Sequence, residues 1–163
     1  NTIKAFKLFQ ANNNSANVKL ILAGDGILKD KIISTINELN LEKIVILIGL
    51  IEREDVYNFL EKCDLFIMPS ISEGLNISFL EAMSMKTKVL VSDIEQFTYP
   101  FKHYNLNPIK FNVYFSNPDS KNDIKKGMDI ALHSNKNIDF SMNCFSLDNM
   151  IKEYQLIYKE LLK

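Results

Sequence analysis

Short apolar runs alternate along this chain with longer segments in which the apolar residues are spaced three or four positions apart. Continuous runs rich in Val, Ile and Leu are typical of buried strands, whereas the wider spacing is typical of a helix with one apolar face. The runs predict strands at 18–23, 44–48, 64–68, 88–91 and 112–115. The spaced segments predict helices at 2–11, 28–39, 54–62, 77–85, 119–133 and 147–162.

The predicted strands are apolar at nearly every position, which indicates burial on both faces and favours a parallel sheet covered by helices. Strands that alternate with helices of this length predict an α/β fold, a Rossmann-like doubly wound parallel sheet with helices on both faces and right-handed crossovers. The segment 97–110 fits this pattern least, because Pro100 and Pro108 are expected to break any long element there.

Length and charge limit the number of domains and the kinds of binding partner. A chain of 163 residues is enough for one domain, so we expect 1–163 to form a single unit. The formal net charge of -1 gives no electrostatic reason to bind nucleic acid. The chain opens without a Met or a signal-peptide pattern, and we expect it to be a piece of a longer protein. Cys63 and Cys144 lack metal-ligand spacing, which favours reduced thiols in the cytoplasm.

Four of the five glycines follow the carboxyl ends of three successive predicted strands: Gly24 and Gly26, Gly49, and Gly74. These ends share one edge of a parallel sheet, and ligands bind in the crevice there. Glycine lets the backbone approach a ligand closely and present its N–H groups. Each glycine on its own is better explained by a tight strand-to-helix turn, and it is their clustering at one edge that favours a binding site. The segment around Asp25 lacks the third glycine of a dinucleotide-binding fingerprint, which argues against a nicotinamide site.

Glu73 and Glu81 add carboxylates to this edge, one in the loop after the third strand and the other in the first turns of the next helix. The free N–H groups of a helix N-terminus suit a phosphate, and carboxylates accept hydrogen bonds from sugar hydroxyls. Together they predict a site for a nucleotide-diphosphate sugar. The alternative is a capping box, in which Glu81 reaches back to the N–H of Ser78. A helix that starts earlier, with Asn76 as its N-cap, removes that box.

The string 69–83, PSISEGLNISFLEAM, resembles the E-x7-E region of the retaining glycosyltransferases of family four, which have the GT-B fold. Further segments are similar to that family's Gly-rich turns and neighbouring strands, and the resemblance covers most of 1–96 in the expected order. They are 22–26, 46–49, 64–68 and 89–93. The resemblance implies that this chain is the C-terminal, donor-binding half of such an enzyme.

The family implies a role for each matching position. Glu81 would hold the ribose hydroxyls of the donor nucleotide, and Glu73 would be the catalytic carboxylate beside the donor hexose. Backbone amides of Gly74, Leu75, Asn76 and Ile77 would meet the hexose and the pyrophosphate. The turns containing Gly24, Asp25, Gly26 and Gly49 would line the nucleotide pocket. Such enzymes need no metal ion and no cofactor besides the substrate.

The sequence departs from the family at three positions. Lys86 and Lys88 stand where Gly and Pro are usual, and Asn76 stands where Gly or Pro is usual. A phosphate-binding Lys that the family carries upstream of the first helix lies outside the chain, as does the acceptor-binding domain. We therefore expect the isolated chain to be inactive in sugar transfer.

The resemblance implies transfer of a hexose to a growing glycan, either capsular polysaccharide, exopolysaccharide or lipopolysaccharide, with the glycan or lipid-linked acceptor held by the N-terminal domain. A cytoplasmic enzyme is expected, with peripheral attachment to the inner face of the membrane open for the complete protein. Two alternatives stay open: a sugar-nucleotide epimerase of the same architecture, and a non-catalytic domain that binds nucleotide sugars or acts as a scaffold. A phosphorylatable receiver is disfavoured, since no acidic cluster follows the first strand.

Overall fold

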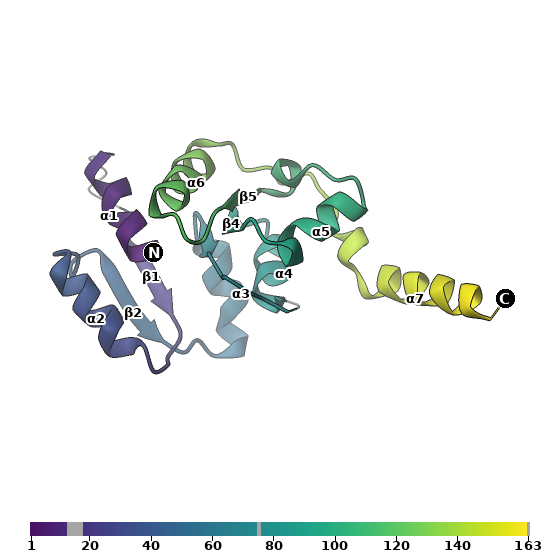
Figure 1. Ribbon diagram of the computed structural model, residues 1–163, viewed down its shortest axis with the longest axis horizontal. Helices are drawn as coiled ribbons and strands as arrows, with labels where there is room; N and C mark the ends of the chain where they lie inside the picture. Colours follow the sequence, from purple (N-terminus) through teal and green to yellow (C-terminus); the bar gives the residue numbers. More distant parts are fainter. Residues whose placement is uncertain (13–17, 75, 163) are drawn as a thin grey trace.

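The computed structural model describes residues 1–12, 18–74 and 76–162, in which helices and strands alternate as the sequence predicts (Figure 1). The predicted residue Leu75 lies outside the described residues. The elements, with η for a 3-10 helix, are α1 (Thr2–Asn12), β1 (Leu20–Ala23), α2 (Lys29–Glu38), β2 (Val45–Gly49), α3 (Arg53–Lys62), β3 (Phe66–Met68), α4 (Ile77–Ser84), β4 (Val89–Ser92), α5 (Glu95–His103), η1 (Pro108–Phe111), β5 (Val113–Ser116), α6 (Lys121–His133), η2 (Asn143–Phe145) and α7 (Leu147–Leu161).

All strand pairs are parallel, but the strands are divided over two sheets. β1 pairs with β2, and β4 lies between β3 and β5. The parallel α/β class is confirmed. The division into two sheets is a feature that strand patterns do not reveal, because a pattern of apolar residues marks a strand without naming its neighbours.

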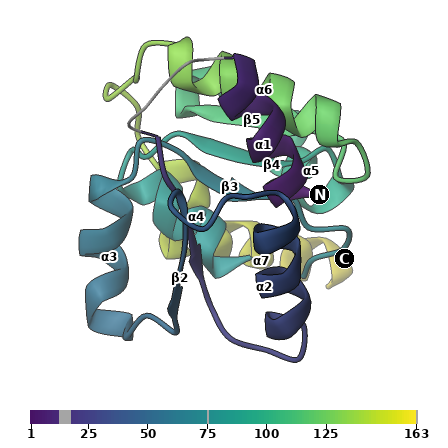
Figure 2. The ribbon, with the colours of Figure 1, turned by 90° about the vertical axis from the view of Figure 1, so that its left-hand side faces the viewer.

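Alternate residues of the strands point to opposite faces, and each face has its own core. In β4, Leu90 packs with residues of α1 and α6, whereas Val89 and Val91 pack with residues of α4 and α5. The first core also holds Leu20 of β1 and Ile36 of α2. Helices α1, α2 and α6 therefore lie on one face and α3, α4 and α5 on the other, which confirms helices on both faces (Figure 2).

The segment 97–110 is more regular than expected. Pro100 lies inside α5, where its ring removes one backbone hydrogen bond, and the helix still ends only three residues later at His103. Phe97 and Phe101 of α5 are buried, so their packing holds the helix despite the proline. Pro108 does mark a boundary: it begins η1 after the N-cap Asn107.

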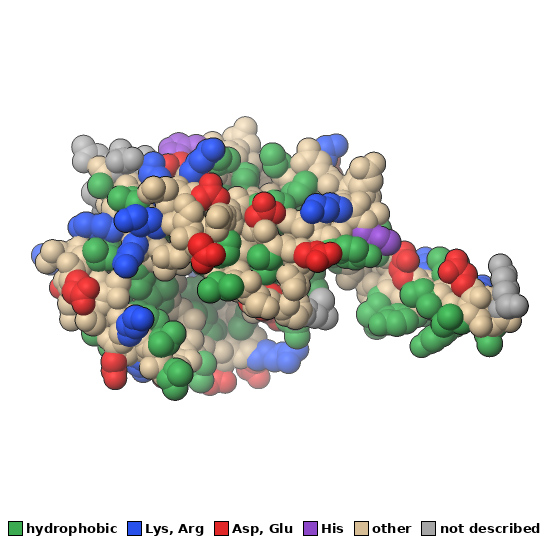
Figure 3. Space-filling view, in the orientation of Figure 1, with side chains coloured by type: hydrophobic (Ala, Val, Ile, Leu, Met, Phe, Trp, Pro, Cys, Tyr) green, Lys and Arg blue, Asp and Glu red, His purple; other side chains and the backbone are tan. Residues whose placement is uncertain are grey.

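Helix α7 forms as predicted but does not close the domain. It projects from the rest of the molecule and carries hydrophobic side chains on its surface (Figures 1 and 3). None of its described residues is buried, and Tyr154 and Ile157 are about half exposed. No described residue of α7 belongs to either of the two cores.

Candidate functional site

The loop between β3 and α4 is held firmly at both ends. The hydroxyl of Ser92, at the end of β4, donates to the carbonyl of Ser70 at 2.5 Å. At the other end, the Asn76 Oδ1 atom accepts from the backbone N–H of Phe79 at 2.9 Å, and its Nδ2 group donates to Met68 Sδ at 2.8 Å. Asn76 thus joins the end of a strand to the start of a helix, and the two contacts hold 70–74 and Asn76 at the carboxyl edge of the sheet.

The Asn76 cap decides between the two interpretations of Glu81. Because α4 begins at Ile77, the predicted alternative with Ser78 as N-cap is wrong. Glu81 is half-buried, and its carboxylate makes no hydrogen bond or ion pair within the described ranges. The core-facing residues of α4 are Phe79, Ala82 and Met83, so Glu81 lies on another side of the helix. Its carboxylate is available for a ligand.

The start of α4 also offers backbone donors. The first turn of a helix has N–H groups without intrahelical partners. Phe79 uses its N–H on the cap, whereas the N–H groups of Asn76 and Ile77 make no hydrogen bond to other described residues. Together with the positive end of the helix dipole they suit an anion. Gly74 is exposed and Glu73 is half-buried, without a side-chain partner in the described part of the loop.

The second group of predicted residues lies at the ends of β1 and β2. The N–H of Gly24 donates to the carbonyl of Gly49 at 2.6 Å, next to a register shift that pairs Ala23 with Gly49. Gly24 and Gly49 adopt φ values of 129° and 72°, which other residues rarely reach. The pairing of β1 with β2 thus places the two turns side by side, and their positive φ values explain why glycine stands at both positions.

Asp25 is engaged within its own turn. Its Oδ1 atom accepts from the N–H of Gly26 at 2.8 Å, and its Oδ2 atom pairs with the Lys29 ammonium at 3.0 Å. The hydrogen bond from Lys29 and then that from Gly26 hold the pKa of Asp25 below its ordinary value. Lys29 is a cation at this edge that sequence analysis missed, although the i, i+4 spacing from Asp25 could have revealed it.

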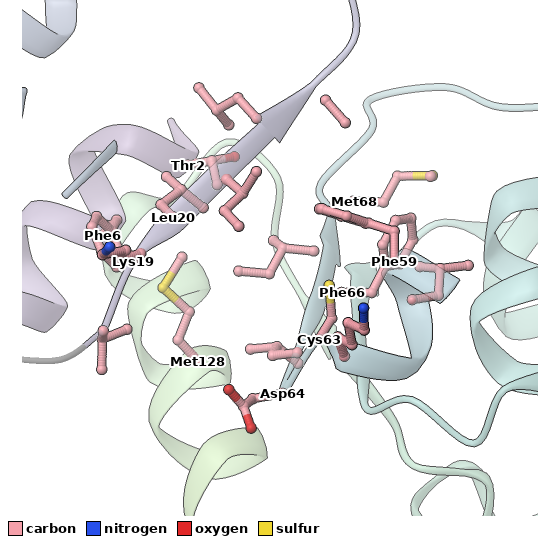
Figure 4. Close-up of a pocket in the computed structure, with 18 of the residues that line it drawn as sticks. Thr2, Phe6, Lys19, Leu20, Phe59, Cys63, Asp64, Phe66, Met68 and Met128 are labelled. Carbon is pink, nitrogen blue, oxygen red and sulfur yellow. The ribbon is translucent and has the colours of Figure 1, made fainter. Parts of the chain in front are cut away.

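Gly24 and Ser78 are among the lining residues of a pocket of about 720 Å³ (Figure 4), and Gly24 is the one predicted site residue of the described chain that lines it. The structure thus brings Gly24 and Gly49 into contact, and it keeps Glu73 and Glu81 near the start of α4. No hydrogen bond links the two groups among the described residues.

The unusual lysines lie at the opposite end of α4. Lys86 adopts a φ of 59°, a conformation that favours glycine, and its amine donates to the carbonyl of Phe140 and lies 3.7 Å from the centroid of that ring. The Lys88 amine donates to the carbonyl of Ser134 at 2.7 Å. Both lysines bind the segment after α6, so these departures from the family pattern leave the start of α4 unchanged.

The described ranges contain neither a membrane-spanning helix nor a metal-binding cluster. Among these residues, no helix is long and apolar enough to cross a membrane. No group of three or more His, Cys, Asp or Glu side chains in the described chain is placed to hold a metal ion.

The parallel strands, the two helical layers and the loop-to-helix unit after β3 define the Rossmann-like half of a GT-B glycosyltransferase. The sucrose-phosphate synthase of Thermosynechococcus elongatus has this fold, with a TM-score of 0.73 over 99% of this chain and 42% of that chain. At 17% sequence identity, the likeness shows the fold alone. The chain belongs to the glycosyl transferases group 1 family, whose model matches residues 1–144.

Curated relatives agree with this assignment. An uncharacterized glycosyltransferase of Methanocaldococcus jannaschii is 30% identical over 88% of this chain and 37% of its own length. An O-antigen biosynthesis glycosyltransferase of Escherichia coli is 29% identical over 88% of this chain and 39% of its own length. A 4-alpha-N-acetylgalactosaminyltransferase of Campylobacter jejuni, which acts on a diphospho-undecaprenol substrate by its name, is 34% identical over 47% of this chain and 20% of its own. The chain thus matches two fifths or less of these relatives' length.

Proposed function

We propose that this chain is the donor-binding domain of a retaining glycosyltransferase, which moves a hexose from a nucleotide-diphosphate sugar to a growing glycan. The observation that carries the proposal is the Asn76 cap, because it leaves both the Glu81 carboxylate and the first N–H groups of α4 available. Family membership supports a glycosyltransferase. The retaining mechanism and the E-x7-E roles of Glu73 and Glu81 are the more specific part of the proposal.

In this proposal the start of α4 binds the diphosphate of the donor. The N–H groups of Asn76 and Ile77 and the helix dipole stabilise the charge that develops as the nucleotide diphosphate departs. Glu73 stabilises the oxocarbenium-like centre of the transferring hexose. No metal ion is required, because backbone donors and cationic side chains neutralise the leaving group.

The nucleotide occupies the remainder of the carboxyl edge. Glu81 accepts hydrogen bonds from the ribose hydroxyls, and the paired turns at Gly24 and Gly49 let the backbone approach the base. The turn at Asp25 and Gly26 forms the outer rim, where the exposed Lys29 contributes a positive charge.

The acceptor is proposed to be a glycan or a lipid-linked saccharide, held by a domain outside this chain. Two relatives support this idea through their names, which specify diphospho-undecaprenol substrates. An O-antigen relative supports a role in surface polysaccharide synthesis. Transfer by these 163 residues alone is not expected, since they match only part of such enzymes.

Calorimetric titration with UDP, GDP, ADP and their hexose conjugates tests the proposal. The titration is performed on these 163 residues alone and on a longer polypeptide that contains them and transfers sugar. For the nucleotide that binds, Glu81→Gln is expected to weaken affinity by roughly 10- to 100-fold, because hydrogen bonds to a charged acceptor contribute about 1.5–3 kcal/mol.

Glu61→Gln is the matched control, since Glu61 is an exposed glutamate near the far end of α3. It should leave binding unchanged. Equal affinity of the Glu81→Gln variant and the parent chain would argue against the ribose role. Absence of binding by any nucleotide in the transferring polypeptide would overturn the proposal as a whole.

A further inference from the structure

Ser92 ends the central strand of the three-stranded sheet and has a serine on each side. Ser70 lies two residues after the end of β3, and Ser116 is the last residue of β5. β4 lies between these two strands, and Ser116 is the in-register partner of Ser92. The three serines therefore form a row across the carboxyl edge of this sheet, with Ser92 in the middle.

The side chains of Ser92 and Ser116 lie on the same face of the sheet. Side chains alternate along a strand, so Ser92 shares the face of Leu90, and Ser116 shares the face of Tyr114. Leu90 and Tyr114 both belong to the core that α1 and α6 cover. Ser92 is fully buried and Ser116 is 2% exposed. Two hydroxyl groups are therefore held side by side in the interior, away from water.

The two buried hydroxyls differ in their hydrogen bonds. The Ser92 hydroxyl donates to the carbonyl of Ser70 at 2.5 Å. The Ser116 Oγ atom is the one buried side-chain nitrogen or oxygen of the described ranges that has no hydrogen-bond partner. A buried hydroxyl without a partner is costly, and folded proteins rarely retain one. We therefore looked for a partner that a second arrangement of the same residues offers to Ser116.

Ser92 can reach either neighbour, but only one at a time. Adjacent strands lie about 4.8 Å apart, so two in-register hydroxyls that point toward one another come within hydrogen-bond distance. Ser70 and Ser116 lie on opposite sides of β4. A serine side chain turns between staggered positions about χ1, and a hydroxyl that points to one strand points away from the other. The Ser70 carbonyl and the Ser116 hydroxyl are thus alternative partners of Ser92.

We propose that Ser92 is a two-position latch for the loop between β3 and α4, with the Ser116 hydroxyl as its second partner. In the held position, which the structure shows, Ser92 donates to Ser70 and the Ser116 hydroxyl is unpaired. In the released position Ser92 turns to Ser116, the two hydroxyls bond to each other, and the carbonyl of Ser70 turns to solvent. The new bond offsets the bond lost at Ser70, so the two positions differ little in free energy.

The latch acts on the segment that carries Glu73. Glu73 lies three residues after Ser70, and Asn76 fixes the far end of the same loop to the start of α4. Release at Ser70 therefore moves Glu73 while the start of α4 stays in place. Such a step suits a loop that admits a donor and then holds a carboxylate beside its hexose. This consequence rests on the proposed function, whereas the latch itself depends only on the serine hydroxyls and the loop backbone.

NMR relaxation dispersion of the backbone amides tests the latch, because it measures exchange on the microsecond-to-millisecond timescale and the population of the minor state. The spectra are recorded without nucleotide on these 163 residues, for the parent chain and for the variants Ser116→Ala, Ser92→Ala and Ser134→Ala. Ser134→Ala is the matched control. Its hydroxyl bonds to the carbonyl of Ala131, away from the loop.

The amides of 71–74 are expected to show dispersion in the parent chain and in Ser134→Ala. Ser116→Ala removes the second partner of Ser92, so the population of the minor state should fall by roughly two- to tenfold. Ser92→Ala removes the latch, so the dispersion should vanish and the resonances of 71–74 should move to the shifts of the parent's minor state.

Two results would overturn the latch: no dispersion at 71–74 in the parent chain, or the parent's minor population in Ser116→Ala. No nucleotide is present in these measurements. A failure of nucleotide binding would therefore count against the proposed donor site and leave the latch standing, whereas a failure of the latch would leave the donor site standing.

Discussion

The two halves of this molecule contain similar apolar strands but bury them to different degrees. In the three-stranded half, β4 lies between β3 and β5, and Val89, Leu90 and Val91 are fully buried. In the two-stranded half, β1 and β2 pair only with each other among the described residues, and Ile21 is 41% exposed and Ile46 37% exposed. The difference arises from the number of neighbouring strands, since the residues in both halves are alike in hydrophobicity.

Burial of a strand is therefore a property of its place in the sheet, and the same comparison holds within one sheet. Ile67 of β3 is paired with Leu90 of β4, yet only Leu90 is fully buried. Variants of Ile67 on β3 and Leu90 on β4 can test whether the edge of β3 is exposed to solvent.

The largest effect is expected for Leu90→Ala, which should lower the free energy of unfolding by about 2–5 kcal/mol through lost contacts and a residual cavity. Ile67→Ala should cost roughly half as much or less, because Ile67 already meets solvent at the open edge. Urea unfolding of both variants measures the two costs. Equal costs would mean that the edge of β3 is covered in solution and would remove the basis of the comparison.

A smaller effect is expected for Gly127→Ala in α6, which packs on β4. A Cβ atom at Gly127 would lie 2.5 Å from Cδ1 of Leu90, so the side chain must shift within a packed core. Helix propensity favours alanine by up to ~1 kcal/mol. The clash outweighs this gain, so the free energy of unfolding is expected to fall by about 1–2 kcal/mol net.

A double-mutant cycle with Leu90→Ala separates these two contributions. In the Leu90→Ala background the contact is gone, and Gly127→Ala should stabilise the protein through helix propensity alone. If Gly127→Ala has the same effect in both backgrounds, the close approach of α6 to Leu90 does not restrict this position. The glycine would then need another explanation.

These particular residues show what the sequence could and could not predict. The strands around Leu90 and Val45 were predicted because runs of apolar residues report burial on both faces. The pairing of β1 with β2 alone could not be predicted, since a sheet neighbour distant in sequence leaves no local signal. Pro100 was expected to break its segment, but tertiary packing of Phe97 and Phe101 outweighs the lost hydrogen bond.

The candidate site likewise has features that the sequence predicts and features that only the structure reveals. The spacing of Glu73 and Glu81 was visible in the sequence, whereas the choice between Asn76 and Ser78 as N-cap required the position of the first helical turn. The role of Ser92 as a support for Ser70 was not predicted, because the two residues are joined only through the pairing of β3 with β4.

The helices that follow the strands at the carboxyl edge also begin differently in the two halves. In the three-stranded half α4 starts from the Asn76 side-chain cap, whereas in the two-stranded half α2 starts after Leu28, which provides no such hydrogen bond. Asn76→Ala should cost about 1 kcal/mol of stability through the lost cap, and it should weaken binding of the nucleotide diphosphate.

Two controls sharpen this prediction. Asn76→Asp keeps a capping oxygen and should retain stability, but its negative charge should still weaken diphosphate binding. Leu28→Ala, at the start of α2, should change neither stability nor binding through capping. Thermal unfolding and calorimetric titration measure both properties. Unchanged diphosphate binding in Asn76→Asp would indicate that the diphosphate does not lie at the start of α4.

The smallest effect is expected at the Asp25–Lys29 pair of the two-stranded half, which is about half exposed on both sides. The hydrogen bond from Lys29 and that from Gly26 lower the pKa of Asp25 in the folded chain. Its contribution to stability is therefore present above the unfolded pKa of about 3.9 and is lost as the pH falls through the lower folded value. Asp25→Asn should lower the unfolding midpoint slightly at pH 7 in dilute salt, and this difference should shrink at high salt and disappear in acid. A difference that persists at high salt, or that grows as the pH falls, would show that the turn depends on more than this exposed ion pair.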